Sequence, residues 1–391
     1  MVDSARGNNL DTVRRHNLAT VLGLVHRGGP AARSQLTQST GLNRSTVGAL
    51  VGELVDLGLV QESEPSASNR VGRPSPMVAA DSRVVAIAVN PEVDAITVGV
   101  VGLDGTLHRR VRYPTGHVPT AAEAATIVGA VVDGLRPDLA TFTRVVGIGV
   151  AVPGLVREAD GVVRLAPNLE WVDEPFTRML EDATGFSARA ANDASLGATA
   201  ESYFGAGRGA TDLVYVNGGA SGIGAGVIVG GSPLTGISGY AGELGHTLVN
   251  TNGVRCHCGA IGCFETEVNQ DALLRVLGQQ VADSEELDRV LAASADDPAV
   301  AAEIDRQLRY LAVALRNATN LFNPGLIVLG GFLESLYQVA PERLTSLVAE
   351  QVLRATGESL AIVRAELGSR ILMIGAAELA FGPLLADPAG A

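Results

Sequence analysis

The chain has 391 residues, of which 47% are hydrophobic and 4% aromatic, and its formal net charge at pH 7 is -13. This composition is typical of soluble α/β proteins and excludes a disordered or fibrous chain, while the length favours two or three domains over one. No run of about 18 uninterrupted apolar residues occurs, and residues 1–11 lack the layout of a secretion signal, so we expect a cytoplasmic protein without a membrane partner.

Positive charge is concentrated near the N-terminus. Residues 1–75 contain eight Arg and six acidic residues, a net charge of +2, which leaves -15 for the remainder of the chain. The net charge therefore excludes a protein that coats nucleic acid along its whole length, and any contact with DNA is expected in this first segment.

Three helices are predicted in the same segment. Apolar residues recur at helical spacing over residues 12–26, and a short helix follows at Ser34–Ser39. The glycine-containing turn Thr40–Leu42 joins it to a third helix with apolar residues over 47–55 on one face, which ends before Gly58. Two helices joined by such a turn indicate a helix-turn-helix.

The third helix and the segment after it supply the candidate DNA contacts. Leu59–Ser63 and Met77–Ala80 can pair as strands of a wing, and either Asn43 or Ser45 can cap the helix. A recognition helix places its N-terminal residues in the major groove, so the predicted contacts are Arg33, Asn43, Arg44, Ser45, Thr46, Arg70 and Arg73. The alternative is a three-helix module that binds protein, or helices that cap the larger domain.

From residue 84 onward, apolar strands alternate with helices. Strands are predicted at 84–89, 96–101, 145–150, 213–216, 226–229 and 326–329, and helices at 120–135 and 193–204. Such alternation favours a largely parallel or mixed sheet covered by helices, the α/β class. Because the pattern partly repeats after Phe264, we expect two related α/β lobes with a cleft between them. The predicted domains are residues 1–80, 81–200 and 201–391.

The three cysteines predict a metal site. Cys256, Cys258 and Cys263 fall within eight residues, and His246 lies ten residues before the first. Three thiolates and one imidazole complete a tetrahedral set with no vacant position, which indicates structural Zn²⁺. A reducing cytoplasm and an odd number of cysteines both disfavour disulfides. His257 is the competing ligand, and we expect its side chain to point away.

Two segments carry a resemblance to a known family. Gly239–Thr247 and Cys256–Glu265 resemble the signature of the ROK family of repressors, open reading frames and sugar kinases. Further similar segments are 153–154, 192–194, 221–226 and 323–331. The resemblance implies a two-lobed body with the actin/hexokinase-like (ribonuclease H-like) ATPase fold, placed after a winged helix-turn-helix.

The resemblance also implies a sugar site. In the enzymes of the family, an Asp in the position of Asp193 acts as general base on a sugar hydroxyl. The residues that match sugar-binding or cleft-lining positions are Gly154, Asn168, Asn192, Asp193, Glu243, His246 and Glu265. Carboxylates and amides grip vicinal hydroxyls through paired hydrogen bonds. For Asn192 and Asp193 the alternative is a helix cap, and for Glu243 and Glu265 it is the orientation of zinc ligands.

The predicted phosphate loop departs from the pattern of ROK kinases. Those enzymes have Asp-x-Gly-Gly-Thr after the first strand, whereas this chain has Asn90–Pro91, and Pro91 lacks a backbone N–H donor. Phosphoryl transfer depends on positioning and neutralising phosphate, so Asp193 should be a vestigial base and ATP is not expected as a cofactor. The second loop is altered as well. This chain has Ala220–Ser221 at the place where the kinases of the family have Thr-Gly.

Together these features predict a regulator and not an enzyme. The expected function is a DNA-binding transcriptional repressor of sugar metabolism genes, with a catalytically inactive kinase-like domain that binds a sugar effector and structural Zn²⁺. The expected partners are a double-stranded operator and further copies in a homodimer or homotetramer. The alternatives are an ATP-dependent sugar kinase with an appended DNA-binding domain, and a body that senses a partner protein.

Overall fold

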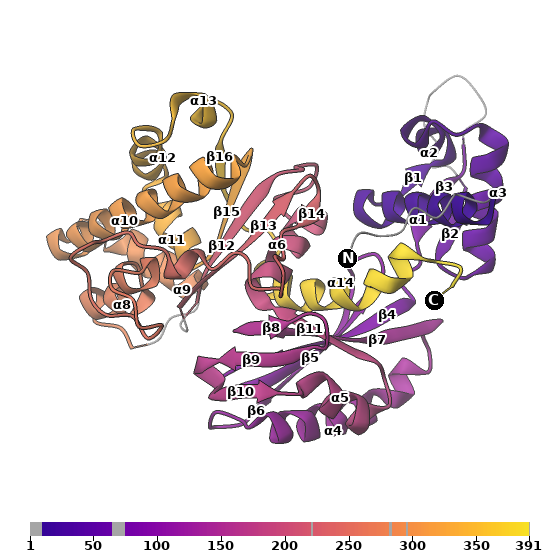
Figure 1. The fold of residues 1–391 in the computed structure, drawn as a ribbon, viewed down its shortest axis with the longest axis horizontal. Coiled ribbons are helices and arrows are strands. Elements are labelled where there is room, and N and C mark those ends of the chain that lie inside the picture. Colours follow the sequence, from indigo (N-terminus) through magenta and orange to yellow (C-terminus); the bar gives the residue numbers. More distant parts are fainter. Residues whose placement is uncertain (1–9, 65–74, 220–221, 281–283, 295, 391) are drawn as a thin grey trace. The chain divides into compact units, whose positions relative to one another are not determined.

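The computed structural model describes all residues except 1–9, 65–74, 220–221, 281–283, 295 and 391 (Figure 1). The first described elements include three helices. The elements are α1 (Leu10–Gly28), β1 (Ala31–Ala32), α2 (Arg33–Thr40), α3 (Arg44–Asp56), β2 (Val60–Ser63) and β3 (Met77–Ala80). Each helix buries one apolar face, including Leu22 of α1, Leu36 of α2 and Val51 of α3. These helices and the pairing of β2 with β3 confirm the predicted elements of a winged helix-turn-helix.

The wing differs from the prediction in one respect. The two-residue strand β1 pairs with β3, so that three strands form a sheet in the order β1-β3-β2. A strand of two residues has no periodicity that a sequence could reveal. Arg70 and Arg73, predicted at the tip of the wing, lie outside the described residues.

The first large sheet has five strands in the order β11-β7-β4-β5-β6. They are β4 (Val84–Pro91), β5 (Ala95–Gly102), β6 (Leu107–Pro114), β7 (Arg144–Val152) and β11 (Ala188–Asn192). Neighbours β4, β5 and β6 are antiparallel, whereas β4 and β7 are parallel. Helices α4 (Ala121–Leu139) and α5 (Phe176–Thr184) pack against each other beside this sheet (Figure 1).

The second large sheet repeats this plan. Its order is β14-β13-β12-β15-β16, from β12 (Leu213–Gly219), β13 (Gly222–Val229), β14 (Ser232–Pro233), β15 (Leu326–Gly331) and β16 (Ala361–Arg364). If the five strands of each sheet are numbered in chain order, both sheets have the spatial order third, second, first, fourth, fifth. In both sheets the first strand, β4 or β12, is antiparallel to the second and parallel to the fourth. The predicted mixed sheets and the internal repeat are therefore confirmed.

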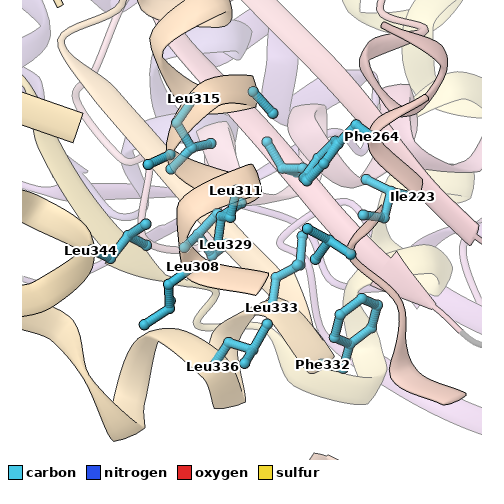
Figure 2. Close-up of a cluster of buried hydrophobic side chains, with 14 of the residues drawn as sticks. Ile223, Phe264, Leu308, Leu311, Leu315, Leu329, Phe332, Leu333, Leu336 and Leu344 are labelled. Carbon is cyan, nitrogen blue, oxygen red and sulfur yellow. The ribbon is translucent and has the colours of Figure 1, made fainter. Parts of the chain in front are cut away.

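Helices from the second half of the chain bury an apolar core against the second sheet. Leu308, Leu311 and Leu315 of α10 (Pro298–Phe322) lie on one helical face and belong to the same buried cluster as Phe264 and Leu333 (Figure 2). The other helices here are α7 (Phe264–Glu267), α8 (Gln270–Leu277), α9 (Ser284–Ala293), α11 (Phe332–Val339), α12 (Pro341–Ala349) and α13 (Arg354–Gly357). This core supports the segments that carry the candidate site.

The chain forms two compact units, and both are discontinuous in sequence. Unit 1 consists of residues 1–150, 175–190 and 376–391, and unit 2 of residues 151–174 and 191–375. The predicted domains were three continuous segments, so the units do not follow those boundaries. Helix α6 (Asp193–Phe204) belongs to unit 2, and so does a small antiparallel sheet of β8 (Leu155–Arg157), β9 (Val162–Ala166) and β10 (Trp171–Glu174).

The last helix, α14 (Ile371–Ala386), contributes residues to both units. Among the described residues, Gly368–Ala386 is the one stretch long and apolar enough to cross a membrane, judged by length and composition alone. Half of the residues in its most apolar 18-residue window are buried inside the protein. The helix packs closely against β7 at Gly149. A Cβ atom on Gly149 would lie 1.7 Å from the carbonyl oxygen of Ala376 in α14.

Within unit 1, α14 and α1 share a buried ion pair. The His26 Nε2 atom of α1 lies 2.8 Å from Glu378 Oε2 of α14, and its Nδ1 lies 2.5 Å from the Leu103 carbonyl oxygen. Both side chains are almost fully buried. Burial by itself lowers the pKa of His26, but the Glu378 carboxylate and the Leu103 carbonyl outweigh it, so the pKa is raised above 6.5. The pair therefore ties the start of the chain to its end.

Candidate functional site

Unit 2 contains a cavity of about 540 Å³. Its walls come from the residues around β8 and β9, the start of α6, the paired strands β12 and β13, and the segment 243–265. All predicted sugar-site residues line it, namely Gly154, Asn168, Asn192, Asp193, Glu243, His246 and Glu265. The fold thus brings together side chains that are up to 111 positions apart in sequence, from 154 to 265.

The start of α6 places two polar side chains in this cavity. Asn192 caps the helix, because its Oδ1 accepts from Ser195 N at 3.0 Å, while its Nδ2 donates to the Gly154 carbonyl oxygen at 3.1 Å. Asp193 Oδ1 accepts from Ala194 N at 2.8 Å. Both residues therefore hydrogen-bond at the start of the helix and also line the cavity.

Burial makes Asp193 a weaker acid than an exposed aspartate. Desolvation, with a smaller contribution from Glu243, raises its pKa to about 6. A carboxyl group that titrates near neutrality can donate or accept a proton, the property that a kinase base requires.

Asp193→Asn should stabilise the protein at neutral pH. The folded-state pKa lies above the ordinary value of 3.8, so stability is greatest below 3.8 and is lost as the pH rises through about 6. The asparagine keeps Oδ1 but cannot ionise, so the variant should gain about 1–3 kcal/mol at pH 7.5 and nothing at pH 4. Denaturant unfolding of both proteins across this pH range measures the difference, and parallel pH profiles would contradict it.

The predicted zinc ligands form a cluster. The ligand atoms of His246, Cys256, Cys258 and Cys263 all lie within 4.8 Å of one another. His246 Nδ1 is 3.6 Å from Cys256 Sγ, and Cys258 Sγ is 3.6 Å from Cys263 Sγ. Ligands in a tetrahedron around zinc at about 2.3 Å are separated by roughly 3.7 Å, so the residues present fit the metal in both chemistry and spacing.

The expectation that His257 points away from this cluster is wrong. Its Nδ1 lies 3.8 Å from Cys256 Sγ and 3.1 Å from Glu265 Oε1, a contact between imidazole and carboxylate that draws the ring inward. His246, Cys256, His257 and Glu265 therefore form a second group of mutually close ligand atoms. The set with three thiolates matches the preference of zinc for sulfur better than the mixed set.

His246 and Glu265 connect the cluster to the cavity. The Nδ1 atom of His246 faces the cysteines, while its Nε2 lies 3.9 Å from Glu243 Oε2, and the residue also lines the cavity. Glu265 Oε1 lies 3.0 Å from Cys256 Sγ and 3.4 Å from His246 Nδ1. Both interpretations of Glu265, contact with the zinc ligands and contact with the cavity, are therefore compatible with its position.

Sequence reasoning missed several residues that line the cavity. Asn217 is a polar residue at the end of the apolar strand β12, and its Oδ1 accepts from the Tyr215 hydroxyl at 3.1 Å. A single amide side chain that follows four apolar residues in a strand could have indicated this residue of the cavity wall from the sequence. Leu155, Leu165 and Ile223 form an apolar part of the wall, and nothing in their spacing distinguishes them from core residues.

The segment that the sequence comparison with ROK kinases singled out, Asn90–Pro91 and the turn after it, lies in unit 1 at the end of β4 and before β5. Asn90 and Pro91 pair with β5, and the acids of the turn are engaged: Arg112 donates to Glu92 Oε2 at 3.1 Å and to Asp94 Oδ1 at 2.8 Å. One guanidinium is thus shared by the two carboxylates that follow β4, and Pro91 has no backbone N–H to donate.

The predicted DNA contacts fall into two groups. Asn43 Oδ1 caps α3 by accepting from Thr46 N at 2.8 Å, and Arg44 and Ser45 are exposed beside it. Arg33, in contrast, forms an ion pair with Glu62 of β2. Its guanidinium thus has a partner inside the protein, which makes Arg33 a weaker candidate for a phosphate contact than Arg44.

Comparison with known proteins decides the family. Residues 86–382 match the ROK family. The chain belongs to the ROK family. Two transcriptional regulators align over almost the whole chain. The xylose repressor of Bacillus subtilis (strain 168) is 27% identical over 93% of this chain and 94% of its own. The transcriptional dual regulator NagC of Escherichia coli (strain K12) is 28% identical over 94% and 92%.

Solved ROK structures confirm the predicted fold. A ROK family transcriptional regulator described as a homologue of the E. coli MLC protein superposes with a TM-score of 0.78 at 24% identity, over 96% of this chain and 97% of its own. The ROK hexokinase from Thermus thermophilus superposes with a TM-score of 0.62 at 31% identity, over 77% of this chain and 99% of its own. The body is therefore the hexokinase-like α/β fold of the ROK family.

Proposed function

We propose that this ROK protein is a cytoplasmic transcriptional repressor of sugar metabolism genes that binds operator DNA through α3 and its wing, and a sugar in the cavity of unit 2. The observation that carries the proposal is that all seven residues matching sugar-binding or cleft-lining positions of the family line one cavity. The same chain has a helix-turn-helix in which the polar start of α3 is exposed. The xylose repressor and NagC align with both parts.

The proposed cofactor is one structural Zn²⁺, held by His246, Cys256, Cys258 and Cys263. The ion, with its four sites filled by protein, supplies rigidity and no reactive position. It would fix the segment 243–265, so that Glu243 and His246 are presented to the sugar at defined positions. The chain's own residues bind the sugar hydroxyls: carboxylates accept, and the amides of Asn168, Asn192 and Asn217 both donate and accept.

A sugar kinase is the second candidate, because Asp193 has a pKa of about 6 and the Thermus hexokinase is 31% identical. The turn at Asn90–Pro91 argues against it, since its acids are paired with Arg112 and its proline removes a donor. Phosphoryl transfer is almost entirely positioning and charge stabilisation. We therefore propose a regulator that has lost catalysis, with ATP absent from its working cycle.

Regulation would follow from linkage between the two sites. Winged helix-turn-helix repressors read two half-sites as dimers, so we propose a homodimer or a homotetramer of dimers on a palindromic operator. A sugar releases DNA only to the extent that it binds the DNA-free conformation more tightly than the DNA-bound one.

The test uses the purified full-length protein. Duplexes selected from a random library define the operator, and a panel of monosaccharides that includes xylose, glucose and N-acetylglucosamine is then screened for thermal stabilisation, for release of the operator and for ATP-dependent phosphorylation. We expect one sugar to stabilise the protein and weaken operator binding by at least roughly tenfold, the coupling typical of allostery, without turnover. Arg44→Ala should weaken operator binding while sugar binding is retained.

Two outcomes would contradict the proposal. Phosphorylation of any sugar at ordinary enzyme rates of about 1–100 per second would establish the kinase. Selective operator binding that no sugar affects would point to the third hypothesis, a body that senses a partner protein.

A further inference from the structure

The helix-turn-helix is joined to the first large sheet by a short connection that is held by hydrogen bonds. Three residues, 81–83, separate β3 of the wing from β4. The side chain of Asp81 is 2% exposed, accepts from the Arg83 guanidinium at 2.8 Å and is hydrogen-bonded to Gln61 of β2. The carbonyl oxygen of Arg83 accepts from Thr143 N, just before β7, at 2.9 Å. Because both sides of the connection are bonded, it is not a flexible linker.

A second connection within unit 1 is the buried pair of His26 and Glu378. Both ring nitrogens of His26 face oxygen atoms, Glu378 Oε2 at 2.8 Å and the Leu103 carbonyl oxygen at 2.5 Å. An imidazole donates from both nitrogens only when it is protonated, so these two contacts are those of an imidazolium. The ring of Phe381 lies edge-on to that of His26, with 6.2 Å between the ring centroids. One side chain of α1 thus contacts both α14 and the residue that follows β5.

The carboxylate of Glu378 is directed at His26 alone among the described residues. Its second oxygen, Oε1, is buried without a hydrogen bond to any of them. A buried ion pair is a weak source of stability, because apolar side chains of similar volume would fill the same space without the cost of desolvation. The pair is, however, satisfied in one relative orientation of the two helices, whereas apolar contacts tolerate several. It is therefore suited to fix the direction of α1.

We propose that His26 and Glu378 are positioning residues for operator recognition, whose pair holds α1, and with it α3, in one orientation on unit 1. The helix-turn-helix then does not open or turn by itself. Helix α1 can transmit this orientation because it packs against α3 and because Arg14 Nε donates to Glu53 Oε2 of α3 at 3.0 Å. The inference rests on the proposed function, since it concerns the binding of operator DNA.

Two substitutions of Glu378 test the pair. Glu378→Leu leaves the imidazole without a polar partner on α14. In Glu378→Gln, the amide N–H can donate to Nε2 of a neutral His26, whose Nδ1–H still donates to the Leu103 carbonyl oxygen, so the hydrogen bonds are kept without charge. With the selected operator duplex, we expect affinity to fall at least roughly tenfold in Glu378→Leu and to stay within about threefold in Glu378→Gln. Asp387→Asn, which removes a carboxylate from the exposed pair with Arg15, should leave the affinity unchanged.

The pH profile provides a readout that a merely structural role would not change. Burial lowers the pKa of His26 and Arg27 of α1 opposes its charge, but Glu378 and the Leu103 carbonyl outweigh both and raise the pKa above 6.5. The pair is therefore complete below 6.5 and is lost as the pH rises through the folded value. Because Glu378→Gln needs no protonated ring, the operator affinity of the wild type should decline relative to this variant between about pH 6 and about pH 9.

Hydrogen exchange of the wild-type protein provides a readout that needs neither an operator nor a variant. If the helix-turn-helix is fixed on unit 1, the most protected amides of α1 and α3 should exchange within about tenfold of the most protected amides of β4 and β5. Exchange that is faster than this limit in α1 and α3 shows that the helices open independently, and it overturns the inference.

The operator measurements have further outcomes that overturn the inference. These are a loss of affinity in both Glu378 variants or in neither, and a ratio of wild-type to Glu378→Gln affinity that does not change with pH. The emission of Trp171, the single tryptophan, reports whether unit 2 remains folded. If Glu378→Leu does not fold, the pH ratio and hydrogen exchange still decide. If the wild type selects no operator, the proposed function fails, whereas hydrogen exchange still decides whether the helix-turn-helix is fixed on unit 1.

Discussion

Cys263→Ser should abolish zinc binding and the response to sugar together. Cys263 is buried, and its sulfur lies 3.6 Å from Cys258 Sγ, so a hydroxyl in its place removes one of three thiolates from a closed site. We expect zinc content to fall from one ion per chain to none, the melting temperature to fall by several degrees, and the sugar-induced stabilisation to disappear, because Glu243 and His246 lose their fixed positions.

Metal analysis and thiol titration check this prediction. The chain has three cysteines, all in the cluster, so a thiol reagent should find none reactive in the zinc-loaded protein and three after chelation. Leu248→Ala changes an exposed residue of the same segment and should keep its zinc. His246→Ala should lose the metal and His257→Ala should retain it. Full zinc and an intact sugar response in Cys263→Ser would refute the assignment.

Glu378→Ala should destabilise unit 1 by about 3–5 kcal/mol near pH 6, because it removes the carboxylate that pairs with the buried His26. The pKa of His26 is raised in the folded protein, so the stability that the pair contributes is fully present below 6.5 and is lost as the pH rises through the higher folded value. The difference between the wild type and the variant should therefore shrink between pH 6 and pH 9.

An exposed ion pair between α1 and the residue that follows α14 provides the control. Arg15 of α1 and Asp387, just after α14, form an ion pair with side chains about 40% exposed, at 42% and 39%. Arg15→Ala should cost at most about 1 kcal/mol, with little dependence on pH over the same range. Denaturant unfolding of both variants measures the two effects, and a Glu378→Ala protein as stable as the wild type at pH 6 would contradict the prediction.

Local signals explain what the sequence predicted well. The start of α6 is marked by Asn192, whose side chain forms the cap. The grouping of His246 with the three cysteines is indicated by their spacing, because both features are set by residues close together in the chain. The repeat of the two sheets was visible in the alternation of strands and helices.

The missed features depend on residues far apart or on very short elements. His26 reads as the end of an amphipathic helix, and its partner Glu378 lies 352 positions later. The strands β1 and β14 have two residues each, too few for any period. The sheet of β8, β9 and β10 was not predicted either, since β8 has three residues and β10 exposes Val172. Tertiary pairing, and not local propensity, forms these strands.

The discontinuity of unit 1 fixes an order of assembly during translation. Unit 2 is complete once residue 375 has emerged, whereas unit 1 still lacks residues 376–391 at that moment. Because nascent domains fold as their segments become available, the cavity of unit 2 can form before Glu378 is available to pair with His26. The helix-turn-helix is synthesised before unit 2, yet the unit that holds it closes after unit 2.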